Sequence, residues 1–234
     1  MFNWFFKKER KELSGKIAMS GNLTLRQRSS LTVQHLLAAA KFARLCGEIE
    51  RQSIGKPFGD GFNDILQYTS TSVILSVASL ESHINDELDK LHPLFPDHPP
   101  MASAQLINWM SRLSIIEKYR LAIEAKKVAP FDTDSKTYQA ITVLIKFRNA
   151  LVHFKPEWHD EQNEHENLGK LLKSQFELSP WLPKEGSVIF PQRCMCHAGA
   201  KWAVGTARAF MRDFDVRMGI DHRLDLVADQ LGVE

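Results

Sequence analysis

The segment Ser72-Val-Ile-Leu-Ser-Val-Ala-Ser-Leu-Glu-Ser-His-Ile-Asn-Asp-Glu-Leu-Asp-Lys-Leu91 decides the fold class. Its apolar residues step by four, three, four, four and three positions, at Val73, Val77, Leu80, Ile84, Leu88 and Leu91. This spacing puts them in one stripe along an α-helix, with Glu81 and Asp86 on other faces. A helix of this kind is stabilised mainly by packing its stripe on other helices. The segment therefore predicts a helical bundle.

Helical spacing continues on both sides of this segment. A first helix is predicted from Ser29 or Ser30 up to the turn cluster at Gly55, with this buried face: Leu31, His35, Ala38, Phe42, Leu45 and Ile49. Further helices are predicted over residues 103–129, from about residue 134 to 154 or 155, and from about residue 196 to 218. Gly219 is expected to end the last of them.

Residues 156–193 break the helical pattern. They begin with a charged stretch, allow a short helix near 168–176, and contain Ser187–Phe190 as the one plausible strand. Long connections in compact domains are usually functional or mobile. We therefore predict an all-α bundle of about five long helices, with a long irregular insertion before the last helix. Residues 1–28 are expected to form an N-terminal arm, 29–220 the helical domain, and 221–234 a C-terminal tail.

The composition is that of a soluble globular protein. The 234 residues carry a formal net charge of +2, which is too small to indicate nucleic-acid binding by itself. Three cysteines argue against a disulfide framework and favour a reducing, cytoplasmic location. No run is long enough to span a bilayer, so no integral membrane segment is expected. The aromatic residues at 2–6 favour an arm that docks on the body, or alternatively a weak interfacial anchor.

Candidate functional residues gather in Ile145-Lys-Phe-Arg-Asn-Ala-Leu-Val-His-Phe-Lys-Pro156. Pro156 disfavours helix at the preceding residue, so Arg148, Asn149 and His153 lie at the end of a helix. Arg binds phosphate oxygens bidentately, and His can take a proton from a ribose 2′-hydroxyl or give one to the leaving oxygen. Asn149 can fix the substrate or the imidazole. This chemistry fits RNA cleavage, which needs no metal because RNA carries its own nucleophile.

Neighbouring residues extend this interpretation. Lys146, Lys155 and Trp158 could hold an RNA backbone and stack a base, if they share a surface with the motif. A structural alternative stays open, in which Arg148 pairs with a carboxylate such as Glu81 and His153 caps the last helical carbonyls.

Arg148-Asn149 followed by His153 at a helix end resembles the signature of the HEPN superfamily. The segment from Ser76 to Leu88 is similar to the second helix of that family, with Glu81 at its acidic position. The resemblance covers roughly residues 30–218, apart from the insertion, and implies a helical bundle that forms a homodimer with two motifs in one cleft.

Many HEPN domains are metal-independent endoribonucleases, including toxins of toxin–antitoxin pairs and defence effectors. Others are non-catalytic binding or assembly modules. By this resemblance Arg148 and His153 are expected to be catalytic, Asn149 supporting, and Glu81 to orient Arg148. The partners implied are RNA, a second copy of the chain, and an antitoxin or other protein.

A metal site is not expected. Cys194-Met-Cys-His197 places three soft ligands close together, but a structural zinc site takes four, usually from two separated pairs. No second cysteine pair exists in the sequence, and no cofactor is expected.

Overall fold

The computed structural model describes residues 29–57, 59–91, 108–156, 164–183 and 188–233. The predicted N-terminal arm and Trp158 lie outside these residues. The described ranges contain helices and helical turns and no strand, so the predicted all-α class is confirmed. No helix in the same ranges is long and apolar enough to cross a membrane.

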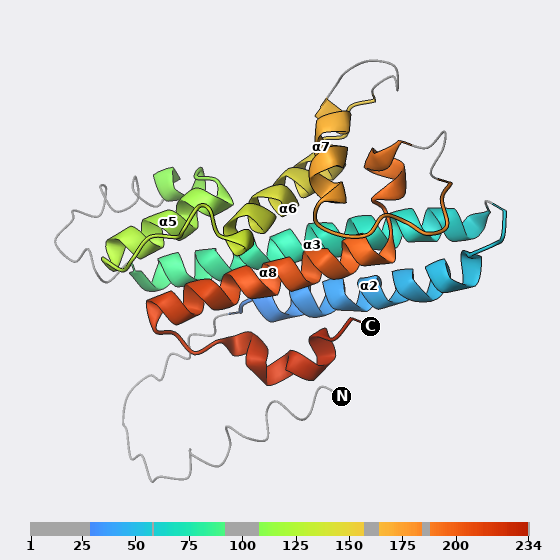
Figure 1. The fold of residues 1–234 in the computed structure, drawn as a ribbon. Helices are drawn as coiled ribbons and strands as arrows, with labels where there is room; N and C mark the ends of the chain where they lie inside the picture. The colour runs from blue at the N-terminus through green and yellow to red at the C-terminus, as the bar shows by residue number, and fades with distance from the viewer. Residues whose placement is uncertain (1–28, 58, 92–107, 157–163, 184–187, 234) are drawn as a thin grey trace, which may run out of the picture.

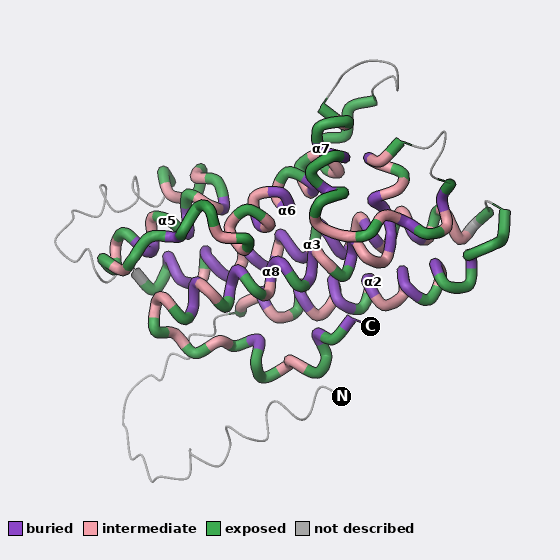
Figure 2. Tube along the Cα trace, in the orientation of Figure 1, coloured by how far each residue is buried: buried purple, intermediate pink, exposed green. Residues whose placement is uncertain are grey.

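Three long helices lie side by side and form the body of the molecule (Figure 1). They are α2 (Thr32–Ser53), α3 (Asp60–Leu91) and α8 (His197–Met218). The predicted stripe of α3 is buried from Val73 to Leu88. Figure 2 shows the buried residues along the facing sides of these three helices.

The buried face of α2 differs from the predicted one. Leu31 is exposed, and the other five residues of the predicted face are half-buried. The face is turned by about one residue, or about 100° on a helix, and consists mainly of small residues. Its buried members include Leu36, Ala39, Ala40, Ala43, Cys46 and Gly47. Short side chains let α2 approach α3 and α8 closely.

Helix α8 follows its prediction. Ala203, Ala207, Phe210 and Phe214 are buried on its inner side. Gly219 ends the helix in the left-handed conformation, at φ 65°, where a residue with a Cβ would be strained.

The predicted helix over residues 103–129 is interrupted. Residues 108–111 are helical, and a new helix, α5 (Ile115–Ala125), begins after Ser114. Ser114 accepts a hydrogen bond from the Glu117 backbone, and Glu117 accepts one from the Ser114 backbone. This reciprocal capping box starts α5 at a fixed residue.

The remaining elements complete the bundle. Helix α6 (Lys136–Val152) packs on α3 and α8, as α5 also does. Helix α7 (Glu164–Lys173) stands against α6, next to a π-helical turn, η2 (Ile189–Arg193) (Figure 1). A 3-10 helix, η3 (Arg223–Leu231), returns along α2. The predicted strand at 187–190 is not formed in its described part, because the chain turns into η2 at Ile189.

Candidate active site at the end of helix α6

Helix α6 carries the motif into solvent at its C-terminal end. Its last helical residue is Val152, slightly before the predicted end. His153 is the C-cap at φ −111° and ψ 38°, and its backbone N–H donates to the Asn149 carbonyl at 2.9 Å. The backbone of His153 thus completes the helix and leaves its side chain exposed.

Arg148 and His153 differ in their surroundings. Arg148 is half-buried, and its Nε is shielded from solvent with no hydrogen-bond partner in the ranges that the structure describes. Asn149 and His153 are exposed. Within the described part of the chain, no hydrogen bond or ion pair joins the side chains of these three residues to each other or to a neighbour. A buried donor without a partner is costly, so an incoming anion would satisfy Arg148.

Two further cations flank the motif. Lys146 precedes Arg148 and Lys155 follows His153 by two residues each, and both side chains are exposed. Neither has an ion pair among the described residues. The end of α6 therefore carries positive charge that no carboxylate among the described residues pairs with. Trp158, the third residue predicted to bind substrate, lies outside the described range.

Glu81 does not contact Arg148 in this structure. Its Oε1 lies 3.5 Å from Nζ of Lys118, which is a buried residue on α5. A buried ammonium needs a compensating charge, and half-exposed Glu81 supplies it. The expected role of Glu81 in orienting Arg148 stays a prediction, since in this structure its carboxylate lies beside Lys118 of α5.

Part of the insertion packs against the residue that follows the motif. The ring of Phe154 stacks on the imidazole of His165 from α7, with 5.1 Å between ring centroids. Phe190 packs edge-on against His165 at 4.8 Å. Helix α7 and η2 thus meet the chain one residue after His153. The sequence placed the insertion next to the motif but carried no signal for this aromatic contact.

The Cys194–His197 segment has a structural role. Cys196 Sγ accepts from the Gly199 backbone and caps α8, while His197 Nδ1 bonds the Ala43 carbonyl at 2.9 Å. Burial raises the pKa of the Cys196 thiol to about 12. No group of three or more His, Cys, Asp or Glu side chains in the described ranges is arranged to hold a metal ion.

Comparisons with protein-family models, with curated proteins and with solved structures found no match for this chain. The site must therefore be interpreted from its own residues.

Proposed function

We propose that the protein is a HEPN-like, metal-independent endoribonuclease that acts at a dimer cleft. The observation that carries the proposal is the end of α6, where a half-buried Arg148, whose shielded Nε has no hydrogen-bond partner among the described residues, precedes an exposed His153. A guanidinium that lacks a carboxylate partner is suited to a phosphate, which it can bind through two parallel hydrogen bonds.

The reaction follows from these two groups. The imidazole of His153 removes the proton from a ribose 2′-hydroxyl, and the 2′-oxygen attacks the adjacent phosphorus. The bond from phosphorus to the 5′-oxygen of the next nucleotide breaks, and the second copy's imidazole donates a proton to that oxygen. Arg148 stabilises the added negative charge on the phosphate. The products are a 2′,3′-cyclic phosphate and a free 5′-hydroxyl.

Asn149, Lys146 and Lys155 have supporting roles in this proposal. Asn149 is exposed on the same face as His153 and can hold the substrate or the imidazole. The two lysines hold the RNA backbone on either side of the scissile phosphate. A toxin or defence role follows if the RNA cleaved is essential to the cell, with an antitoxin or other protein as the controlling partner.

The proposal is tested by incubating purified protein with single-stranded RNA in excess EDTA. Cleavage that leaves 2′,3′-cyclic phosphate ends is expected. His153→Ala and Arg148→Ala should each lower the rate at least about 100-fold, the usual effect of losing a general base or an oxyanion donor. Expression of the wild type should arrest growth, and His153→Ala should relieve the arrest.

The matched control is His35→Ala, which removes a half-buried histidine from α2. It should cleave RNA at the wild-type rate. Cleavage that persists in His153→Ala, or that vanishes with EDTA, would contradict the proposal. Full activity of a monomer at concentrations where no dimer forms would contradict the shared cleft.

Two observations favour a second function, a non-catalytic HEPN-like binding or assembly module. Glu81 is bound to Lys118, and α7 packs on Phe154 beside the motif. An inactive wild type that forms a dimer and retains a protein partner, with binding lost on changing the exposed Phe154, would support this function instead.

A further inference from the structure

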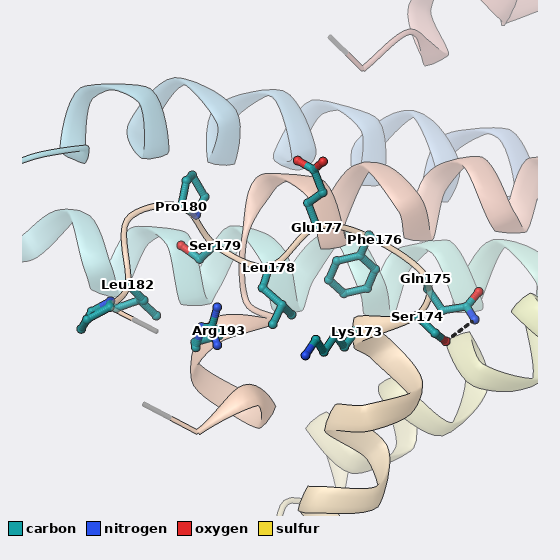
Figure 3. A pocket seen from close by; sticks show the side chains of 11 residues that line it. Lys173, Ser174, Gln175, Phe176, Glu177, Leu178, Ser179, Pro180, Leu182 and Arg193 are labelled. Carbon is teal, nitrogen blue, oxygen red and sulfur yellow. Dashed lines mark hydrogen bonds between the residues drawn. The ribbon is translucent and has the colours of Figure 1, made fainter. Parts of the chain in front are cut away.

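A pocket of about 870 Å³ lies away from the α6 motif, where α7 ends and residues 174–183 cross over η2. Figure 3 shows it between the end of α7, this crossing segment and Arg193. The volume falls within the range of about 300–1,000 Å³ that small-molecule sites occupy. The predicted irregular insertion thus builds a pocket of its own.

Two cations face this pocket. The side chains of Lys173 and Arg193 point into the same space beside Leu178, whereas Glu177 points to the other side of the segment (Figure 3). In the part of the chain that the structure describes, the side chains of Lys173 and Arg193 have no hydrogen bond or ion pair. Nε of Arg193 is shielded from solvent and has no hydrogen-bond partner in the described ranges. Two cations that converge on a hollow, with no ion pair among the described residues, favour an anion there, although Glu177 is also part of the lining.

The other walls are apolar and amide-bearing. Phe176, Leu178 and Leu182 line the pocket beside the cations. Phe176 is held in place by the indole of Trp202, at 5.3 Å between ring centroids. Gln175 donates to the Ser174 hydroxyl at 3.1 Å, and both polar groups stand at the rim (Figure 3). A ligand that suits this lining carries a charged group at one end and a flat apolar group with polar edges at the other.

The back of the pocket is fixed to the bundle. The Ser179 hydroxyl donates to Oε1 of Glu50 at 3.2 Å, and the Ser179 backbone N–H donates to the Arg193 carbonyl at 2.8 Å. The hydroxyl and backbone N–H of Ser179 are therefore already used in hydrogen bonds within the protein, and Ser179 is not a ligand-binding group. These bonds hold the crossing segment against α2 and η2, so the pocket walls are preorganised.

We propose that this pocket binds a nucleotide, with its phosphate between Lys173 and Arg193 and its base against Phe176 and Leu178. Arg matches phosphate geometry bidentately and Lys adds a point charge. The nucleotide comes either from a free mononucleotide or from a single-stranded RNA. Binding at this pocket does not depend on cleavage at the α6 motif.

Calorimetric titrations of the full-length protein test the site. The probes are AMP, inorganic phosphate, and a five-nucleotide RNA with 2′-O-methyl groups that prevent cleavage. AMP binding is expected, with phosphate as a competitor. Lys173→Gln and Arg193→Gln should each weaken AMP binding about tenfold, since each removes a charge-assisted contact.

Lys170→Gln is the matched control, because Lys170 lies one turn earlier on α7, pairs with Glu166 and does not line the pocket. It should change AMP affinity less than about twofold. Unfolding temperatures of the variants should match the wild type, so that a loss of binding reports the pocket. His153→Ala should bind AMP as the wild type does, which separates this site from the proposed ribonuclease.

The two sources of the nucleotide give different results. If the modified RNA binds no tighter than AMP, the site takes a free nucleotide. If it binds more than about tenfold tighter, and Lys173→Gln and Arg193→Gln remove that gain, the site holds a strand. The proposal is overturned if none of the three probes binds, or if both substitutions bind AMP with wild-type affinity.

Discussion

His83 on α3 and Asp215 on α8 are joined inside the bundle, with 3.0 Å between Nε2 and Oδ1. The other carboxylate oxygen of Asp215 is bound by Nδ1 of His222. His83 also contacts the Tyr119 hydroxyl through Nδ1 at 2.9 Å. These polar side chains tie α3, α5, α8 and the start of η3 together at the end of the bundle opposite η2. Because the ionised carboxylate only accepts, both imidazoles donate to it.

Replacing Asp215 should destabilise the fold strongly. Asp215→Asn leaves two buried imidazole donors facing an amide that accepts at one atom only, so we expect a loss of about 3 kcal/mol in the free energy of unfolding. Urea denaturation measures it. Asp213→Asn, two residues earlier on α8, removes a part-buried pair with Arg217 and should cost less than about 1 kcal/mol. Equal losses in the two variants would contradict a structural role for this network.

Asp215 should also make the fold sensitive to acid. Burial raises the pKa of its carboxyl, but the hydrogen bonds from His222 and His83 outweigh this and hold the pKa below its ordinary value of 3.8. A lowered pKa contributes stability that is present above the ordinary value and is lost as pH falls through the folded value. The wild type should therefore lose more stability than Asp215→Asn below about pH 4, in urea titrations at several pH values.

Glu50 should change the pH dependence of stability in the opposite direction to Asp215. Burial raises the pKa of its carboxyl above 4.5, although hydrogen bonds from Ser179 and the His197 backbone lower it in part. The folded state then binds more protons than the unfolded state between the two pKa values, so stability falls as pH rises through this window. Glu50→Gln should flatten the fall in unfolding free energy just above pH 4.5, whereas Glu48→Gln at an exposed position should keep it.

The sequence predicts where the helices lie better than it predicts which side of each helix is buried. The α3 stripe consists of large apolar residues and is buried from Val73 to Leu88 as predicted. On α2 the same rule selects Phe42 and Leu45, which are half-buried, over Ala43 and Gly47, which are buried. Hydrophobic spacing favours bulky residues, whereas the close approach of three helices requires small ones. Nothing along α2 itself reveals how near its neighbours come.

Features that depend on neighbouring residues could be predicted from the sequence, whereas contacts between residues far apart in the chain could not. The Ser114–Glu117 capping box follows a sequence signature that marks a helix start, so the break before α5 could have been predicted. The end of α6 near Pro156 was predicted from local chemistry. The partner of Glu81 could not be predicted, because Lys118 lies on another helix, and the spacing within one helix does not show which residue of a neighbouring helix it meets. His83 and Asp215, which are 132 residues apart, carry no local signal at all.

Gly47 tests how closely α2 approaches α8, and Gly205, at an open position on α8, is its control. A Cβ at Gly47 would lie 2.6 Å from Nδ1 and 3.0 Å from Cγ of His197, so the ring that bonds Ala43 would have to move. Gly47→Ala should cost about 2 kcal/mol of unfolding free energy by overpacking. Gly205→Ala meets no atom within 4 Å on an exposed side of α8 and should stabilise by about 0.5 kcal/mol or more. Thermal unfolding of the two variants should shift in opposite directions.

The pairing of Glu81 with Lys118 can be separated from a role at Arg148 by a double-mutant cycle. Glu81→Gln leaves the buried Lys118 ammonium without its partner, and we expect a loss of about 1–2 kcal/mol, less than for a fully buried pair because Glu81 is 46% exposed. Lys118→Met fills the same space without a charge and should be close to neutral.

In the double variant the cost of Glu81→Gln should disappear, because no buried charge remains to be compensated. Urea denaturation of the four proteins gives the coupling energy. RNA cleavage, if the wild type shows it, should then be normal in the double variant. If Glu81 instead orients Arg148 during catalysis, cleavage stays low in both Glu81→Gln proteins while stability recovers in the double variant. That result would support the role that the family resemblance implies for Glu81.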